Sequence, residues 1–214
     1  MIFDKKLESL ARRAEDFSSD GFIRTSAESL VASDATGSDE DREKLLTHLK
    51  VNKLSIVDEF IDLRIYDLNR RLILAVENES PALNNALREA FEPGKQRFSA
   101  IIPPDSLYAF PSTAIATPLF DIERANQVGY LVCVVDLALV IERSSIGHNS
   151  AIPEPYREKH LSIEDQRGLI LEIPWWYLKN SNESTRPGSE RIGIRVFRGD
   201  QQFSRRLSDR TISQ

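Results

Sequence analysis

The sequence predicts an α+β fold in which a long N-terminal helix precedes a central antiparallel sheet with flanking helices, followed by a smaller module. The N-terminal residues show heptad-like spacing, several strand-like segments lie between Phe60 and Asp136, and a polar stretch separates the C-terminal segment. The expected organisation is a helix over residues 1–37, a main module over 38–143, a linker over 144–160 and a smaller module over 161–214.

Composition and charge exclude several classes of protein. The chain has 214 residues, of which 41% are hydrophobic and 29% charged, as in ordinary soluble globular proteins. Its net charge of −5 argues against general nucleic-acid binding. The single cysteine, Cys133, excludes an intramolecular disulfide and lies in an apolar segment, where a buried inert thiol is expected.

No targeting or membrane segment is expected within the chain. Residues Met1–Lys6 lack the apolar stretch of a signal peptide. The longest apolar run, Gly129–Ile141, contains Asp136 and is shorter than the ~20 residues that cross a bilayer as a helix. This composition fits a soluble protein or a fragment taken from between two membrane spans.

The N-terminal residues are spaced as in one long amphipathic helix that ends at Ser33–Gly37. Its apolar residues alternate between four- and three-residue steps, the seam of a heptad pattern: Phe3, Leu7, Leu10, Ala14, Phe17 and Gly21. Two interpretations remain open, a helix packed on its own domain and a dimer seam. Because the early part of the helix precedes any domain that would cover it, we expect a homodimer.

The first half of the main module predicts a helix, a strand pair and a second helix. Ser38 precedes acidic residues that suit a helix start. Phe60–Asp67 alternates apolar and polar residues, as in a half-buried strand, and a polar turn leads to a second strand at Leu72–Val76. Ser80-Pro81 opens a helix whose apolar spacing continues to Phe91, and Pro93-Gly94 ends it.

The second half of the main module predicts three strands. They lie at Phe98–Ile102, Ala114–Asp121 and Val128–Asp136. In the C-terminal module, Ile163–Leu171 resembles Ile65–Leu74, since each has an apolar residue, an acidic turn and an aliphatic strand. Short strands are also expected at Arg191–Phe197 and Gln202–Leu207, after a mobile loop at Asn180–Glu190.

Motifs for catalysis or metal binding are not found in the sequence. His48, His148 and His160 have no second histidine or cysteine at ligand spacing. No phosphate loop or nucleophile elbow is present. We therefore expect neither a catalytic residue nor a cofactor.

Polar and aromatic residues are predicted to gather over one face of the sheet. There they would form a pocket in which an arginine binds the carboxylate of an anionic or zwitterionic ligand. The alternative is a sheet edge with ordinary surface salt bridges. The candidate ligand-binding residues are Arg64, Tyr66, Arg97, Phe98, Tyr108, Phe110, Thr113 and Asp136.

The N-terminal helix, the strand ending in Tyr66-Asp67 before a polar turn, and the closing segments Ile115–Asp121 and Val128–Leu137 resemble a Cache domain. Cache domains are PAS-like extracytoplasmic sensors of bacterial transmembrane receptors. The resemblance covers about residues 1–142, and the C-terminal segment resembles a second, abbreviated PAS-like module.

The resemblance implies a periplasmic ligand-sensing domain of a membrane-anchored receptor, with a histidine kinase, a cyclic-dinucleotide enzyme or a chemoreceptor as its output. Amino-acid-binding members carry an Arg-x-Trp-Tyr element and a closing aspartate. Asp136 matches the aspartate, whereas Arg97-Phe98 departs from the rest. The resemblance thus implies a small carboxylate or another metabolite as ligand. The alternative is a dimerising interaction module with no ligand of its own.

Overall fold

The computed structural model describes residues 2–32, 39–78, 80–88, 90–103, 107–108, 110–145, 160–164, 169–174 and 195–198. The chain divides into two compact units, Met1–Val140 and Ile141–Gln214. Among the residues in these ranges, no helix has both the length and the apolar character needed to cross a membrane.

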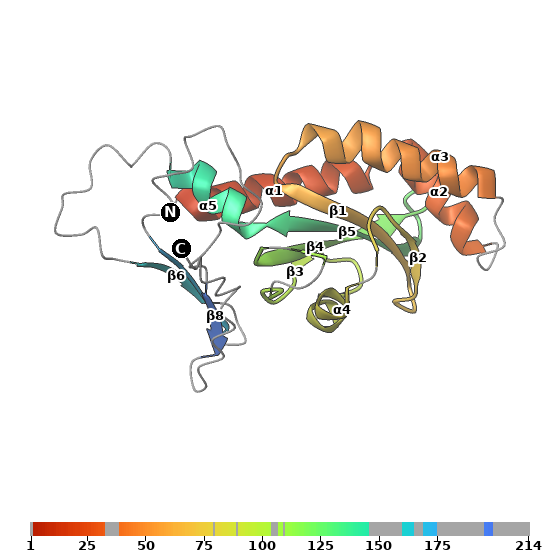
Figure 1. Ribbon diagram of the computed structural model, residues 1–214. Helices are drawn as coiled ribbons and strands as arrows, with labels where there is room; N and C mark the ends of the chain where they lie inside the picture. The colour runs from red at the N-terminus through yellow and green to blue at the C-terminus, as the bar shows by residue number, and fades with distance from the viewer. Residues whose placement is uncertain are drawn as a thin grey trace, which may run out of the picture. The chain divides into compact units, whose positions relative to one another are not determined.

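A five-stranded antiparallel sheet forms the centre of the first unit (Figure 1). Its strands lie in the order β2-β1-β5-β4-β3. β1 and β5, the first and last of these strands in the sequence, are therefore neighbours inside the sheet. The predicted α+β class is confirmed, and this sheet with its flanking helices is compatible with a PAS-like fold. The strands are β1 (Phe60–Asp67), β2 (Leu72–Ala75), β3 (Arg97–Phe98), β4 (Ser112–Phe120) and β5 (Gln127–Asp136).

Helices cover both faces of this sheet. α1 (Ile2–Ser18) contacts β4 and β5, and α2 (Gly21–Ala32) contacts β5. α3 (Asp39–His48) contacts α2 and β2. Figure 1 shows these three helices on one side of the sheet and α4 (Pro81–Leu87) on the other.

The prediction of one long N-terminal helix over residues 1–37 was wrong. The helix is interrupted after Ser18, and α2 begins at Gly21. The physical reason is Asp20, whose Oδ1 accepts hydrogen bonds from the backbone N–H groups of Phe22 at 2.9 Å and Ile23 at 3.1 Å. A side chain in this role caps the start of a new helix.

Three residues of the predicted heptad seam, Leu10, Ala14 and Phe17, are buried within the first unit. Phe17 also meets the ring of Phe60 edge to face, with 5.8 Å between the ring centroids. This part of the seam therefore packs on the sheet of its own chain, and the expected homodimer stays a prediction.

The second predicted helix is found as α3, which continues into a π-helical turn (Leu49–Lys53) and a 3₁₀ turn (Leu54–Ile56). Its predicted cap, Ser38, lies outside the described residues. The predicted cap of α4 is confirmed, because the Ser80 hydroxyl accepts a hydrogen bond from the N–H of Leu83 at 3.1 Å.

Two predicted elements are shorter than expected. α4 ends at Leu87, although Ala90 and Phe91 after it are still buried. The strand expected at Phe98–Ile102 is reduced to β3 and an isolated bridge between Ile102 and Ser112.

The C-terminal unit contains an antiparallel sheet in the order β6-β7-β8. Its strands are β6 (His160–Glu164), β7 (Leu169–Pro174) and β8 (Arg195–Arg198), and α5 (Leu137–Ser145) spans the boundary between the units. The two segments that resemble each other in sequence both form hairpins, since Ile65 pairs with Leu74 and Ile163 with Leu171. The expected loop at Asn180–Glu190 and strand at Gln202–Leu207 lie outside the described residues.

Candidate ligand-binding site

The face of the sheet under α4 carries a buried charge network that starts on β1. Alternation along the strand directs Asp62, Arg64 and Tyr66 to the same face. Asp62 and Arg64 are both 0% exposed, so β1 is not the half-buried strand that its sequence predicted. The polar residues of β1 are therefore buried as completely as its apolar residues on the other face of the sheet.

Tyr108 joins this network from a segment far along the chain. Arg64 Nε donates to Asp62 Oδ2 at 2.6 Å, and Arg64 Nη2 donates to the Tyr108 hydroxyl at 3.1 Å and to the backbone oxygen of Asn78. The Tyr108 hydroxyl donates to the same Asp62 oxygen at 2.6 Å. Asp62 Oδ1 also accepts the N–H of Glu77 at 3.1 Å. We refer to Asp62, Arg64 and Tyr108 as the buried triad.

Electrostatics fix the protonation states of Arg64 and Tyr108. Burial opposes the charged form of Arg64, but the neighbouring Asp62 carboxylate outweighs this effect and raises the pKa of the guanidinium. Burial and the Asp62 charge both raise the pKa of the Tyr108 phenol. Tyr108 is therefore a neutral donor and Arg64 a permanent cation. Arg64 Nη1 is buried and has no hydrogen-bond partner among the residues that the structure describes.

A pocket of about 310 Å³ opens beside this network, between the β1–β2 hairpin and α4. Buried aromatic and aliphatic side chains of Tyr66, Leu87 and Phe91 line it. The rings of Tyr66 and Phe91 meet with 5.1 Å between their centroids. The pocket is also lined by the half-buried Leu72 and by the exposed residues Arg70, Asn84 and Arg88.

The exposed part of the pocket is basic. Arg70 has φ +65° in the β1–β2 turn, and its guanidinium lies 6.0 Å from the centre of the Phe91 ring. Arg70 Nη1 also donates to the backbone oxygen of Arg88 at 3.3 Å. Among the described residues that line the pocket, none is acidic. Two arginines thus line a pocket that also has an aromatic base, which suits an anionic group on an apolar body.

The structure places the eight candidate residues in different surroundings. Arg64 and Tyr108 are in the buried triad, and Tyr66 lines the pocket. Arg97 forms an ion pair with Glu92, and Phe98 is 42% exposed.

The remaining three candidates take part in local structure. Phe110 is half-buried, and its backbone oxygen accepts a hydrogen bond from Ser112 Oγ at 3.0 Å. Thr113 Oγ1 donates to the backbone oxygen of Ser99 at 3.2 Å. Asp136 Oδ1 accepts the N–H of Leu139 at 3.0 Å and so caps α5.

Asp62, Arg70, Asn84 and Arg88 were not among the predicted site residues. Asp62 carried a signal, because it shares its strand face with Arg64. Asn84 and Arg88 are four residues apart on the α4 segment and lie on one side of it. Arg70 lies in a polar turn, where a charged side chain normally indicates only solvent exposure.

Among the described residues, no group of three or more histidine, cysteine, aspartate or glutamate side chains is placed to hold a metal ion. Cys133 is fully buried in β5, and burial raises the pKa of its thiol. No protein-family model matches the sequence, and no curated protein matches it at a significant level.

Proposed function

We propose that this chain is a ligand-sensing domain that binds a small carboxylate in the pocket between the β1–β2 hairpin and α4. The observation that carries the proposal is that Arg70 and Arg88 line one pocket with Tyr66 and Phe91, while none of the described residues in the lining is acidic. A carboxylate accepts paired, charge-assisted hydrogen bonds from guanidinium groups. The apolar body of the ligand would pack on the aromatic rings.

The pocket is partly preorganised for such a ligand. Arg70 lies within cation–π range of Phe91 and is hydrogen-bonded to the backbone of Arg88. The buried triad holds β1, and therefore Tyr66, through contacts that do not depend on a ligand. A ligand that meets a fixed base and one positioned arginine loses less of its binding free energy to ordering the site.

Binding at this pocket would change the populations of two conformations of the domain. Arg70 belongs to the β1–β2 hairpin and Arg88 follows α4, so one carboxylate that contacts both would favour conformations in which these elements are close. A ligand with different affinity for two conformations shifts their populations. The resemblance to Cache domains supports a periplasmic receptor segment in which this shift displaces the N-terminal helices of a homodimer. The parent protein would be anchored in the membrane and carry a separate output domain.

The binding proposal is tested by calorimetric titration with acetate, succinate and benzoate, and with neutral benzamide as the matched control for benzoate. We expect at least one carboxylate to bind and benzamide not to bind. Arg70→Gln and Arg88→Gln should each weaken binding by about tenfold or more, the loss expected for a charge-assisted hydrogen bond. Arg12→Gln on α1 is the control, since Arg12 is exposed and does not line the pocket.

Binding of benzamide as tightly as benzoate, or unchanged carboxylate affinity in both arginine variants, would overturn the proposed site. If a folded sample binds none of these compounds, the interaction module without a ligand becomes the better account. The receptor context is tested separately by the gene, which should encode a membrane span on each side of this segment.

A further inference from the structure

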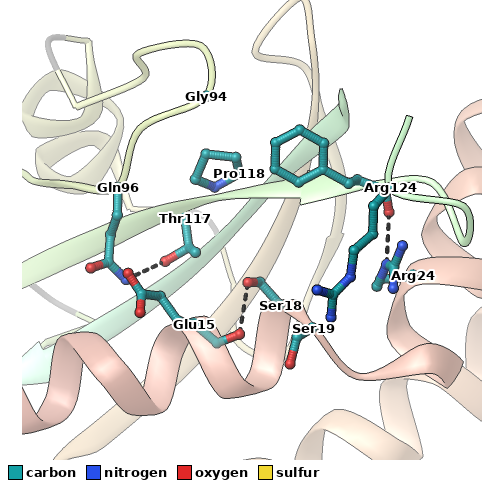
Figure 2. Close-up of a pocket in the computed structure, with 10 residues that line it drawn as sticks. Glu15, Ser18, Ser19, Arg24, Gly94, Gln96, Thr117, Pro118 and Arg124 are labelled. Atoms are coloured by element: carbon teal, nitrogen blue, oxygen red, sulfur yellow. Dashed lines mark hydrogen bonds between the residues drawn. The ribbon is translucent and has the colours of Figure 1, made fainter. Parts of the chain in front are cut away.

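A second pocket, of about 350 Å³, lies on the opposite face of the sheet from α4. Its walls come from the end of α1, the start of α2, the Gly94–Gln96 segment, the end of β4 and the β4–β5 turn. Figure 2 shows Glu15 and Gln96 toward one end, Arg24 and Arg124 toward the other, and Ser18 and Ser19 between them.

The walls of this pocket are held in place by hydrogen bonds between distant segments. Gln96 Nε2 donates to the backbone oxygen of Ala11 at 2.8 Å and to Thr117 Oγ1 at 2.9 Å, which ties α1 to β4. On the other side, Arg24 Nε donates to the backbone oxygen of Phe120 at 3.1 Å, and its Nη2 donates to that of Asp121. Arg24 is only 5% exposed, so it is a fixed part of the wall.

Two charged side chains of the lining have no partner within the described residues. Neither the Glu15 carboxylate nor the Arg124 guanidinium forms a hydrogen bond or ion pair with another described residue. Both are exposed, and they come from different walls, α1 and the β4–β5 turn. Arg124 has φ +60°, a left-handed conformation that is uncommon for a residue other than glycine.

The position of Glu15 favours a positive partner. It lies in the last turn of α1, where the helix dipole is negative, and that turn contains no basic residue. The neighbouring Asp16 already has an ion-pair partner in Arg13, at 3.6 Å. An ammonium group beside Glu15 would neutralise its carboxylate and the adjacent end of the helix dipole.

The opposite end favours a negative partner. Asp121 lies at the start of the β4–β5 turn, and its carboxylate accepts hydrogen bonds from the backbone N–H groups of Ala125 at 2.8 Å and Asn126 at 2.9 Å. Its Oδ2 also accepts the side-chain amide of Asn126 at 2.9 Å. The Asp121 carboxylate is therefore engaged by hydrogen bonds within its own turn. The Arg124 guanidinium, which binds no other described residue, is available to a ligand.

We infer that this pocket is a second binding site, specific for a small zwitterion of the amino-acid class. Its ammonium group pairs with Glu15 and its carboxylate with Arg124. The serine hydroxyls between the two charged ends and the Gln96 side chain at the Glu15 end supply further polar contacts. Because α1 forms one wall and the β4–β5 turn another, the bound zwitterion bridges the N-terminal helix and the sheet. This site is independent of the carboxylate pocket on the other face.

The test is calorimetric titration of the full chain with the common L-amino acids, β-alanine and γ-aminobutyrate. Butyrate and butylamine are the controls that carry only one of the two charges. We expect at least one zwitterion to bind at least about tenfold more tightly than butylamine, and, in the Arg70→Gln background that weakens the carboxylate pocket, at least about tenfold more tightly than butyrate. Glu15→Gln and Arg124→Gln should each weaken its binding by about tenfold or more.

Matched variants separate a local effect from a change in overall charge. Glu8→Gln alters an exposed carboxylate on the same helix, and Arg12→Gln alters an exposed guanidinium, and neither residue lines the pocket. Both should leave zwitterion affinity unchanged. Failure of every zwitterion to bind a folded sample would overturn the inference. Equal loss in the matched variants, or unchanged affinity in Glu15→Gln and Arg124→Gln, would overturn it as well.

Discussion

The Tyr108 hydroxyl donates a hydrogen bond of 2.6 Å to the Asp62 carboxylate, although 46 residues separate them in the sequence. This contact links the segment after β3 to strand β1. The same hydroxyl accepts a hydrogen bond from Arg64 at 3.1 Å, so one oxygen atom contacts both charges of a buried ion pair. The position of the segment over the sheet thus depends on a polar contact as well as on apolar packing.

Removing this hydroxyl tests its contribution. Tyr108→Phe should lower the free energy of unfolding by about 1–3 kcal/mol, because Asp62 and Arg64 each lose a hydrogen-bond partner in a place that water does not reach. Urea denaturation followed by circular dichroism measures the change. Tyr130→Phe is the control, since Tyr130 is buried on the same face and its hydroxyl makes no hydrogen bond with another described residue. An equal loss in both variants would contradict a specific role for Tyr108.

The ion pair itself should show strong coupling between its two members. Arg64→Met should cost about 3–5 kcal/mol, because it leaves the Asp62 carboxylate buried without its cation. Adding Asp62→Asn to Arg64→Met removes that charge and should recover part of the loss. The unfolding free energies of the native protein, the two single variants and the double variant form a double-mutant cycle. Its interaction free energy is expected to exceed the roughly 0.5 kcal/mol within which the effects of independent sites add. Additive effects would show that the two charges stabilise the fold independently.

The local signals in the sequence predicted much of the sheet and one helix start. β1, β2, β4 and β5 follow the predicted segments closely, because two-residue alternation and apolar runs are properties of short stretches. Ser80-Pro81 predicted the start of α4 for the same reason. The break was missed because the heptad spacing continues through Phe17 and Gly21, whereas the Asp20 carboxylate caps the start of a new helix there.

The candidate site was predicted only in part, because its geometry depends on contacts across the fold. Alternation on β1 identified Arg64 and Tyr66 as neighbours on one face. Nothing local to Arg70 or Arg88 indicates that a hairpin turn and the segment after α4 meet at one pocket. Asp136 was expected to close the ligand pocket, and its carboxylate is engaged in capping α5.

Gly129 allows the two central strands to approach each other closely. A Cβ atom at this position would lie 2.2 Å from the backbone oxygen of Tyr66, and no flexible side chain is there to move away. Gly129→Ala should therefore displace β5 from β1 and cost about 1–3 kcal/mol of unfolding free energy. Gly21→Ala is the control, because its Cβ would approach no atom more closely than Ile122 Cδ1 at 3.9 Å. Equal urea midpoints for both variants would contradict this account.

Asp20 should make the stability of the first unit depend on pH under acidic conditions. Burial opposes ionisation of Asp20, but the hydrogen bond from Lys53 Nζ at 2.6 Å, the N–H of Ile23 and the charge of Lys53 together lower the pKa below its usual 3.8. A carboxyl group with a lowered pKa in the folded state contributes stability that is present above its unfolded pKa. That stability is lost as the pH falls below 3.8 and through the folded pKa.

Thermal unfolding of the native protein and of Asp20→Asn between neutral and acidic pH measures this contribution. Asparagine is also a good helix cap but carries no charge. The difference in stability between the two proteins should therefore be present above pH 3.8 and shrink as Asp20 becomes protonated. Asp20→Ala removes the cap as well, which should cost about 1 kcal/mol more than Asp20→Asn at neutral pH. A difference that stays constant across this range would show that the charge of Asp20 contributes nothing to the junction between α1 and α2.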